Sequence, residues 1–293
     1  MAVRLRRRAL LRLATFKPFE AAVRRLDLTE RVARRLALRY VAGTSQADAL
    51  RVATELHAAQ GLASSLDFLG EAVTDQHAVH AATERYVALA QALRQAPEPV
   101  WLAVDLSHVG LDVSDALCRR SLERIVAALP PGRRLQVGAQ DAARNRRILP
   151  LVRALAAEGA PLTATVQANL RSSEADALSL ADASVPVRLV KGAYLEAAAL
   201  ARPWGEATDV AYLRLAQRLH EAGANLALAT HDPVLREALL AALGPLPVEV
   251  LLGVRPGDGP DLVARGVPVR VYVPFGEDWF RYWLRRVAES QGA

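Results

Sequence analysis

The stretch that decides the fold is Val187 to Glu196, with the sequence VRLVKGAYLE. It begins as a short β-branched, apolar run typical of a buried strand, and it breaks at Lys191 and Gly192 into a loop and a helix. Lys191 is therefore expected to lie at the end of a strand. The chain has only two lysines, Lys17 and Lys191, and uses arginine elsewhere. Because the two cations differ in shape and hydration, a compact ammonium group has a specific use here. A chance surface lysine is the simpler alternative.

Apolar runs of this kind recur along the chain, and each is followed by a helical pattern. The eight runs are Leu62–Leu66, Val100–Leu106, Arg134–Val137, Leu162–Val166, Val187–Val190, Leu226–Ala229, Val248–Leu252 and Val269–Val273. Eight is the number that a closed parallel barrel requires. The strands are short and no GxGxxG turn follows any of them, which disfavours an open doubly wound sheet. The sequence predicts an α/β fold, a (β/α)8 TIM-type barrel.

The 293 residues suit one such barrel with a short extension. We expect residues 1–43 to form an N-terminal arm of basic helices that ends at Gly43. We expect residues 44–293 to form the barrel, which would be the catalytic domain. A well-patterned helix follows Ser45 and ends at Gly61, and either Ser45 or Thr44 is placed to cap it.

Positive charge is concentrated in the arm. The net charge is +6 and the isoelectric point about 10.0. The arm carries Arg4, Arg6, Arg7, Arg8, Arg12, Arg24, Arg25, Arg31, Arg34, Arg35 and Arg39 at helical spacings. This pattern suits a helix resting on the barrel, a membrane surface or an acidic partner. A solvated helix face is the simplest interpretation, and no nucleic-acid partner is expected.

The expected location is the cytoplasm, with peripheral contact to the inner face of the membrane as an option left open by the arm. No signal peptide is evident, and no window approaches the ~20 apolar residues of a membrane-spanning helix. Cys118 is the only cysteine, which excludes an intrachain disulfide and fits a reducing compartment.

Polar residues stand where the predicted strands end. They are Asp67, Asp105, Ser107, His108, Gln140, Asp141, Gln167, Asn169, Lys191, Tyr194, Thr230, His231, Asp232, Arg255 and, within the last strand, Tyr272. Chemistry in a barrel of this type lies at the carboxyl ends of the strands, so their convergence predicts a site. No HxH pair closes the first strand and the other histidines fall in helical stretches, so no metal site is expected.

The last helix carries a second set of candidates. Residues 279–289 read WFRYWLRRVAE, which places Tyr282, Arg285 or Arg286, and Glu289 on one face. Two adjacent arginines can both bind a carboxylate that lies across the helix. Such bidentate binding is the usual way in which proteins hold a small acid. The alternative is a surface helix with an ion pair between Arg285 and Glu289, although four aromatic residues argue against a fully solvated face.

Three motifs together resemble the flavin-dependent proline dehydrogenase family in its short bacterial form. They are VRLVKGAYLE after the fifth strand, LALATHD at the sixth, and VRVYVPFGEDWFRYWLRRVAE at the end. RYVAG, LDFLGEAV and DLSHVGLDVS match more loosely, and the similarity runs from about Arg34 to Glu289.

The resemblance implies a barrel that binds FAD and oxidises proline, or a proline-like cyclic or secondary amino acid, by hydride transfer to the flavin N5. Residues that fall where the family contacts FAD are Gln167, Arg188, Lys191, Gly192, Ala193, Tyr194, Thr230, His231 and Glu289. Arg285 and Arg286 fall on the pair that clamps the substrate carboxylate, and Tyr272 and Tyr282 wall the pocket. A quinone or another acceptor would reoxidise the cofactor.

Three positions depart from the family pattern. The family carries a lysine where Asp105 stands and an aspartate where Gly138 stands, and it tends to carry a tyrosine at Asn169. The pocket is therefore expected to be more negative by one charge and roomier near Gly138. A carboxylate at Asp105 favours a substrate with extra positive charge or a larger ring, and Asp105 is a candidate to orient or deprotonate the substrate amine.

Two other readings stay open. A catalytically silent homologue that binds flavin or an amino acid and serves a partner protein would explain the lost lysine and aspartate. A barrel metal-dependent hydrolase is disfavoured by its ligand geometry. The oligomeric state does not follow from the sequence.

Overall fold

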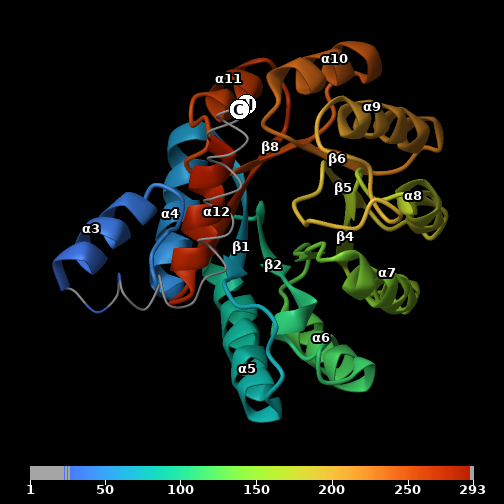
Figure 1. Ribbon diagram of the computed structural model, residues 1–293. Helices are drawn as coiled ribbons and strands as arrows, with labels where there is room; N and C mark the ends of the chain where they lie inside the picture. Colours follow the sequence, from blue (N-terminus) through green and yellow to red (C-terminus); the bar gives the residue numbers. More distant parts are fainter. Residues whose placement is uncertain (1–22, 24, 26, 291–293) are drawn as a thin grey trace.

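The computed structural model shows a closed barrel of eight parallel strands, in which β1 pairs with both β2 and β8 (Figure 1). It describes residue 23, residue 25 and residues 27–290. The strands are β1 Ala63–Phe68, β2 Val100–Val104, β3 Leu135–Val137, β4 Leu162–Gln167, β5 Val187–Val190, β6 Leu226–Ala229, β7 Val248–Leu251 and β8 Val269–Phe275. The predicted barrel is confirmed, and every predicted strand overlaps an observed one.

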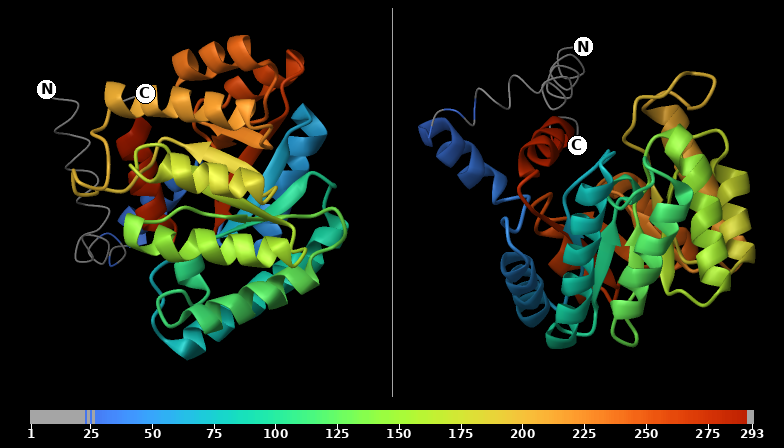
Figure 2. Two further views of the ribbon diagram at one scale, coloured as in Figure 1. Left: turned by 90° about the vertical axis from the view of Figure 1, so that its right-hand side faces the viewer. Right: turned by 90° about the horizontal axis from the view of Figure 1, so that it is seen from below.

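Helices alternate with the strands and surround the barrel (Figures 1 and 2). They are α3 Asp27–Ala37, α4 Gln46–Gln60, α5 Gln76–Ala92, α6 Asp115–Ala128, α7 Ala142–Ala157, α8 Ser173–Asp182, α9 Glu206–Glu221, α10 Pro233–Leu243, α11 Asp258–Ala264 and α12 Trp279–Ser290. The helix predicted after Ser45 is confirmed as α4. Ser45 forms a capping box with Asp48, and Gly61 ends the helix in a left-handed conformation at φ 67°.

Two strand boundaries differ from the prediction in ways that affect the site. The second strand stops at Val104, because a short 3-10 turn begins at Leu106. The first strand runs on to Phe68, so Asp67 lies inside β1 and not after it. Asp67 therefore faces the barrel interior with the geometry of a strand residue.

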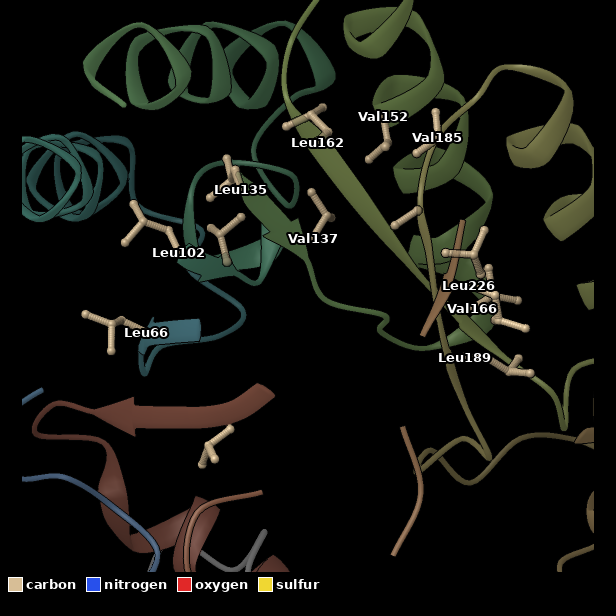
Figure 3. Packing of buried hydrophobic residues seen from close by; sticks show 14 of the residues in the cluster. Leu66, Leu102, Leu135, Val137, Val152, Leu162, Val166, Val185, Leu189 and Leu226 are labelled. Carbon is tan, nitrogen blue, oxygen red and sulfur yellow. The ribbon is translucent and has the colours of Figure 1, made fainter. Parts of the chain in front are cut away.

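The outward faces of the strands form the main core. Leucine and valine side chains on these faces pack against the helices, and Figure 3 shows strand residues such as Leu135 and Leu162 in the same cluster as Val152 of α7. Burial of this apolar layer between strands and helices drives the fold.

The inward face is polar. Gln136 of β3 and Glu249 of β7 come from opposite sides of the ring and hydrogen-bond directly, so both lie in the lumen. Register pairing places further polar residues on the same face, namely Thr163, Thr165, Arg188 and Arg270. Barrels of this class usually fill the lumen with bulky branched residues. The interior of this barrel is therefore built for interactions between polar groups.

The described part of the arm, α3, packs beside α12 outside the ring of barrel helices (Figure 2). Ala33, Ala37, Trp279, Phe280 and Leu284 form a separate apolar cluster between these two helices. The aromatic residues of the last helix are thus used partly for packing. The arginines before residue 23, and Arg24, lie outside the described residues, and the boundary between arm and barrel at Gly43 stays a prediction. Within the described residues, no helix is long and apolar enough to span a bilayer.

Candidate active site

The carboxyl ends of the strands meet at one end of the barrel, which we call the rim. Asp67 is buried at this rim. Its side chain receives hydrogen bonds from the Tyr86 hydroxyl at 3.1 Å and from the Tyr272 hydroxyl. Only 4% of Asp67 is exposed. Burial raises its pKa to about 6, although both hydroxyl donors and the charge of Arg188 work in the opposite direction. The rim thus holds a carboxyl group that is reluctant to ionise.

Asp105, at the end of β2, is the second carboxyl group of the rim. Burial raises its pKa to about 8, and the nearby charges of Asp67 and Glu71 act in the same direction. The positive charges of Arg285 and Arg188 oppose this shift. A group with this pKa exchanges its proton near neutral pH, which is what a catalytic acid or base requires.

Arg285 comes to the rim from α12. Its guanidinium forms an ion pair with Glu71, which lies in the loop after β1 and is 214 residues away in sequence. Arg285 therefore pairs with a carboxylate of the protein itself, and its predicted binding of a substrate carboxylate stays a prediction. The alternative ion pair with Glu289 stays a prediction. The side chain of Glu289 lies outside the described residues.

Three tyrosines line the same region. The rings of Tyr272 and Tyr282 lie 6.2 Å apart at an interplanar angle of 30°. Burial raises the pKa of Tyr194 above its usual value, and the charges of Asp105 and Glu71 add to this effect. Burial likewise raises the pKa of Tyr272, so the hydroxyl groups of Tyr194 and Tyr272 are neutral at physiological pH. Arg286 lies over the Tyr282 ring, with 4.8 Å between its guanidinium carbon and the ring centre.

Gly138 does not provide the expected extra room. A Cβ atom added there would lie 2.1 Å from Oδ1 of Asp105. The Asp105 carboxylate therefore occupies the space that a side chain at position 138 would need. The prediction of extra space near Gly138 was wrong. It considered the side chain that is missing at position 138, but not the Asp105 carboxyl group that fills the same space.

Arg188 extends from β5 into the lumen just below the rim. Its Nε donates to Oε2 of Glu249 at 2.7 Å, and its guanidinium carbon lies 5.9 Å from the centre of the Tyr272 ring. Only 13% of the Arg188 side chain is exposed. Within the described residues, its two Nη groups have no hydrogen bond, so they remain available to a bound group.

Lys191 is held by two carboxylates. Its ammonium group lies 2.7 Å from Asp209 and 2.8 Å from Asp232. Asp232 also caps the N-terminus of α10 by accepting from two backbone N–H groups. The lysine predicted at this strand end is therefore part of an ion-pair cluster that joins the loop after β5 to α9 and α10.

Gly192 approaches Asn169 closely. It has a φ of 109°, and an added Cβ atom would lie 2.1 Å from the Asn169 Oδ1. That buried oxygen has no hydrogen-bond partner among the described residues. Gln167 fixes the next residue, since its Oε1 accepts from the Ala193 N–H at 3.4 Å. The loop after β5 thus offers a backbone surface free of side chain and an unused acceptor.

Thr230 and His231 directly follow β6. The Nε2 of His231 accepts a hydrogen bond from the Leu251 N–H at 3.0 Å. Burial, followed by the charge of Arg286, lowers the pKa of His231 to about 4, so the ring is neutral and its proton sits on Nδ1. Nδ1 is buried without a partner among the described residues. It is therefore a free donor, whereas Thr230 only accepts from the Asp232 N–H at 3.1 Å.

No group of three or more histidine, cysteine or acidic residues with metal-binding geometry occurs among the described residues. His108 is bound to the Phe68 carbonyl at 3.1 Å, and burial lowers its pKa to about 4. Its ring packs against the rings of Phe68 in β1 and Tyr86 in α5.

Sequence reasoning missed three contributors to the site: Glu71, Gln136 and Glu249. Glu71 occurs within the quoted LDFLGEAV motif, but its partner lies at the other end of the chain. Glu249 carried a usable signal, because a charged residue in the middle of the apolar run VEVLL is unusual.

Replacing Gly192 with alanine is expected to lower the free energy of unfolding by about 2–4 kcal/mol, because the positive φ adds strain to the clash with Asn169. The matched control is Gly205→Ala. Gly205 has a similar φ of 103° but no atom within 4 Å of an added Cβ. Equal losses in chemical denaturation would show that the contact with Asn169 contributes nothing.

Comparison with known proteins identifies the family. Residues 49–293 match the family model described as Proline dehydrogenase. Proline dehydrogenase 1 of Bacillus subtilis strain 168 is 31% identical over 261 residues, covering 86% of each chain. Proline dehydrogenase of Deinococcus radiodurans is 34% identical over 268 residues, covering 87% of this chain and 86% of the relative.

Solved structures share the fold. Proline utilization A from Bdellovibrio bacteriovorus, inactivated by N-propargylglycine, aligns with a TM-score of 0.77 at 21% identity and covers 90% of this chain. The Bradyrhizobium japonicum protein of the same name aligns with a TM-score of 0.71 at 20% identity. This chain spans only about a third of their length, at 34% and 32%. Since the family model covers most of the chain and relatives reach 34% identity, this chain belongs to the proline dehydrogenase family of oxidoreductases.

Proposed function

We propose that this protein binds FAD and oxidises proline, or a proline-like cyclic or secondary amino acid. The observation that carries the proposal is the joint position of Arg285 and Asp105 at the rim. Arg285 already binds a carboxylate, that of Glu71, and Asp105 has a pKa of about 8. An amino acid has both complementary groups, a carboxylate for Arg285 and an amine for Asp105.

The reaction balances with these two residues. The substrate amine gives a proton to Asp105, the nitrogen lone pair forms a C=N bond, and the adjacent C–H bond breaks with its electron pair. FAD, when bound, supplies the hydride acceptor at N5, and a quinone or another acceptor later takes the two electrons. Arg285, together with Arg286, holds the carboxylate, and Tyr272 and Tyr282 exclude water.

The residues expected to bind FAD fit a large anionic cofactor. Among the described residues, the two Nη groups of Arg188, the Nδ1–H of His231 and the Oδ1 of Asn169 have no hydrogen-bond partner. Gly192 and the Ala193 backbone allow close approach without a Cβ atom. The others, Gln167, Lys191, Tyr194, Thr230 and Glu289, come from the same strand ends or from α12. Lys191 contributes through its ion pairs, since two carboxylates already hold its ammonium group.

One observation favours a second candidate, a catalytically silent homologue that binds flavin or an amino acid for a partner protein. Glu71 occupies the guanidinium of Arg285, so a substrate carboxylate must displace it. A protein in which this ion pair never opened would bind cofactor without turning over.

Anaerobic absorbance spectroscopy separates these functions. We expect the purified chain, incubated with FAD, to show a bound flavin spectrum that bleaches on addition of L-proline, L-pipecolate, a hydroxyproline or a related amine. Bound flavin that no compound of this panel bleaches would support the silent homologue. Failure to bind FAD would contradict both.

A further inference from the structure

Glu249 is a buried carboxylate in the middle of the lumen, where the reaction described above gives it no task. It lies on β7 with 4% of its surface exposed. It accepts two hydrogen bonds from the Gln136 amide, at 2.9 and 2.7 Å, and one from Nε of Arg188 at 2.7 Å. Two donor nitrogens, Nε2 of Gln136 and Nε of Arg188, thus fix its position from two sides of the barrel.

The contacts of Glu249 determine how Arg188 is presented to the rim. Binding through Nε leaves both Nη groups of Arg188 directed away from the contact, with the Tyr272 ring 5.9 Å from the guanidinium carbon. The carboxylate also cancels the positive charge of Arg188 inside a medium of low dielectric, where an unpaired charge acts over a long range.

We propose that Glu249 is a positioning residue that holds Arg188 beneath the rim and offsets its charge, thereby lowering the reduction potential of the bound flavin. This inference rests on the proposed binding of FAD. Reduced flavin gains negative charge, which an uncompensated Arg188 would stabilise. Glu249 weakens that stabilisation, so the reduced flavin passes its electrons on more readily.

The charge of Arg188 also reaches the two rim carboxyl groups, since it opposes the rise in the pKa of Asp67 and of Asp105. Glu249 therefore affects the rim even without a cofactor. An electrostatic role predicts changes at the rim that a purely structural brace between β3, β5 and β7 does not.

The test compares Glu249→Gln, which keeps the shape but removes the charge, with Glu249→Asp, which keeps the charge. Glu237→Gln is the matched control, because Glu237 pairs with Arg265 on the surface. Redox titration of the FAD-bound proteins is expected to show that Glu249→Gln favours reduced flavin at least about tenfold, a rise of about 30 mV for a two-electron couple. Glu249→Asp and the control are expected to stay within about threefold of the wild type.

A second measurement works without flavin. Carbon-13 NMR of labelled aspartate carboxyl groups is expected to show Asp67 and Asp105 titrating at lower pH in Glu249→Gln than in the wild type. An unchanged potential, or an unchanged titration in flavin-free protein, would overturn the electrostatic role and leave Glu249 a structural brace. If Glu249→Gln does not fold, a tenfold or larger change of potential in Glu249→Asp would also overturn it. Absence of FAD binding by the wild type would instead refute the proposed function, and the NMR titration would still decide the role of Glu249.

Discussion

Replacing Arg285 with methionine is expected to lower kcat/KM by about 100-fold or more for the best amino-acid substrate of the panel. Removing one partner of a buried charge pair costs about 2–5 kcal/mol, because the other charge is left unpaired. Arg285 and Glu71 are only partly buried, with 30% and 31% of their side chains exposed, so the lower end of this range applies. Two carboxylates depend on Arg285, that of the substrate and that of Glu71. The loss should appear mainly in KM if the arginine binds the ground state and the transition state equally.

A substrate without a carboxylate provides the sharpest control. The Arg285→Met enzyme is expected to discriminate less between an amino acid and the matching simple amine, such as L-proline and pyrrolidine. Arg265→Met, which removes an exposed arginine paired with Glu237, should leave both rates unchanged. Equal losses for both compounds in Arg285→Met would rule out carboxylate binding by Arg285.

Replacing Asp105 with asparagine is expected to lower kcat/KM by about 10²–10⁴, the usual contribution of a general base. The base form of Asp105 predominates above its pKa of about 8, so wild-type kcat/KM should rise with pH up to that region. This rise should be absent in Asp105→Asn. Asp115→Asn, which changes an exposed partner of Arg147, is the control for a general loss of charge. A wild-type pH profile in Asp105→Asn would exclude Asp105 as the base.

Asp105→Asn lowers activity but should increase the stability of the folded protein at high pH. The pKa of Asp105 is raised in the folded state, so the folded protein binds this proton more tightly than the unfolded chain. Its contribution to the free energy of unfolding therefore falls as pH rises from about 4 to about 8. Asp105→Asn removes this fall and should be more stable than wild type at pH 8, by on the order of 1 kcal/mol. Thermal unfolding at pH 5 and pH 8 measures the difference.

The barrel fold could be predicted from the sequence because each strand has its own local sequence pattern. The runs at Val187–Val190 and Leu226–Ala229 match β5 and β6 at both ends, since turn-forming residues bound them. The sequence also predicts that Asp105 and Tyr272 lie at one rim, because parallel strands end on the same side. Arg188 is assigned to the site only through the family resemblance.

What sequence reasoning could not supply were contacts between distant elements. The ion pair of Arg285 with Glu71 depends on how α12 lies over the rim, and the bond between Gln136 and Glu249 depends on barrel register. The space around Gly138 depends on the side-chain rotamer of Asp105, which no spacing rule reveals.

The closure of the barrel between its first and last strands has a consequence for biosynthesis. β1 meets β8 along a register that runs from Ala63 opposite Arg270 to Phe68 opposite Phe275. During synthesis on the ribosome, the edge of β1 that pairs with β8 stays unpaired until β8 has been made. Unpaired strand edges promote aggregation. Contacts that span so much sequence also slow folding. The barrel therefore depends on the synthesis of β8 to leave the state in which it is most exposed to chaperones and proteases.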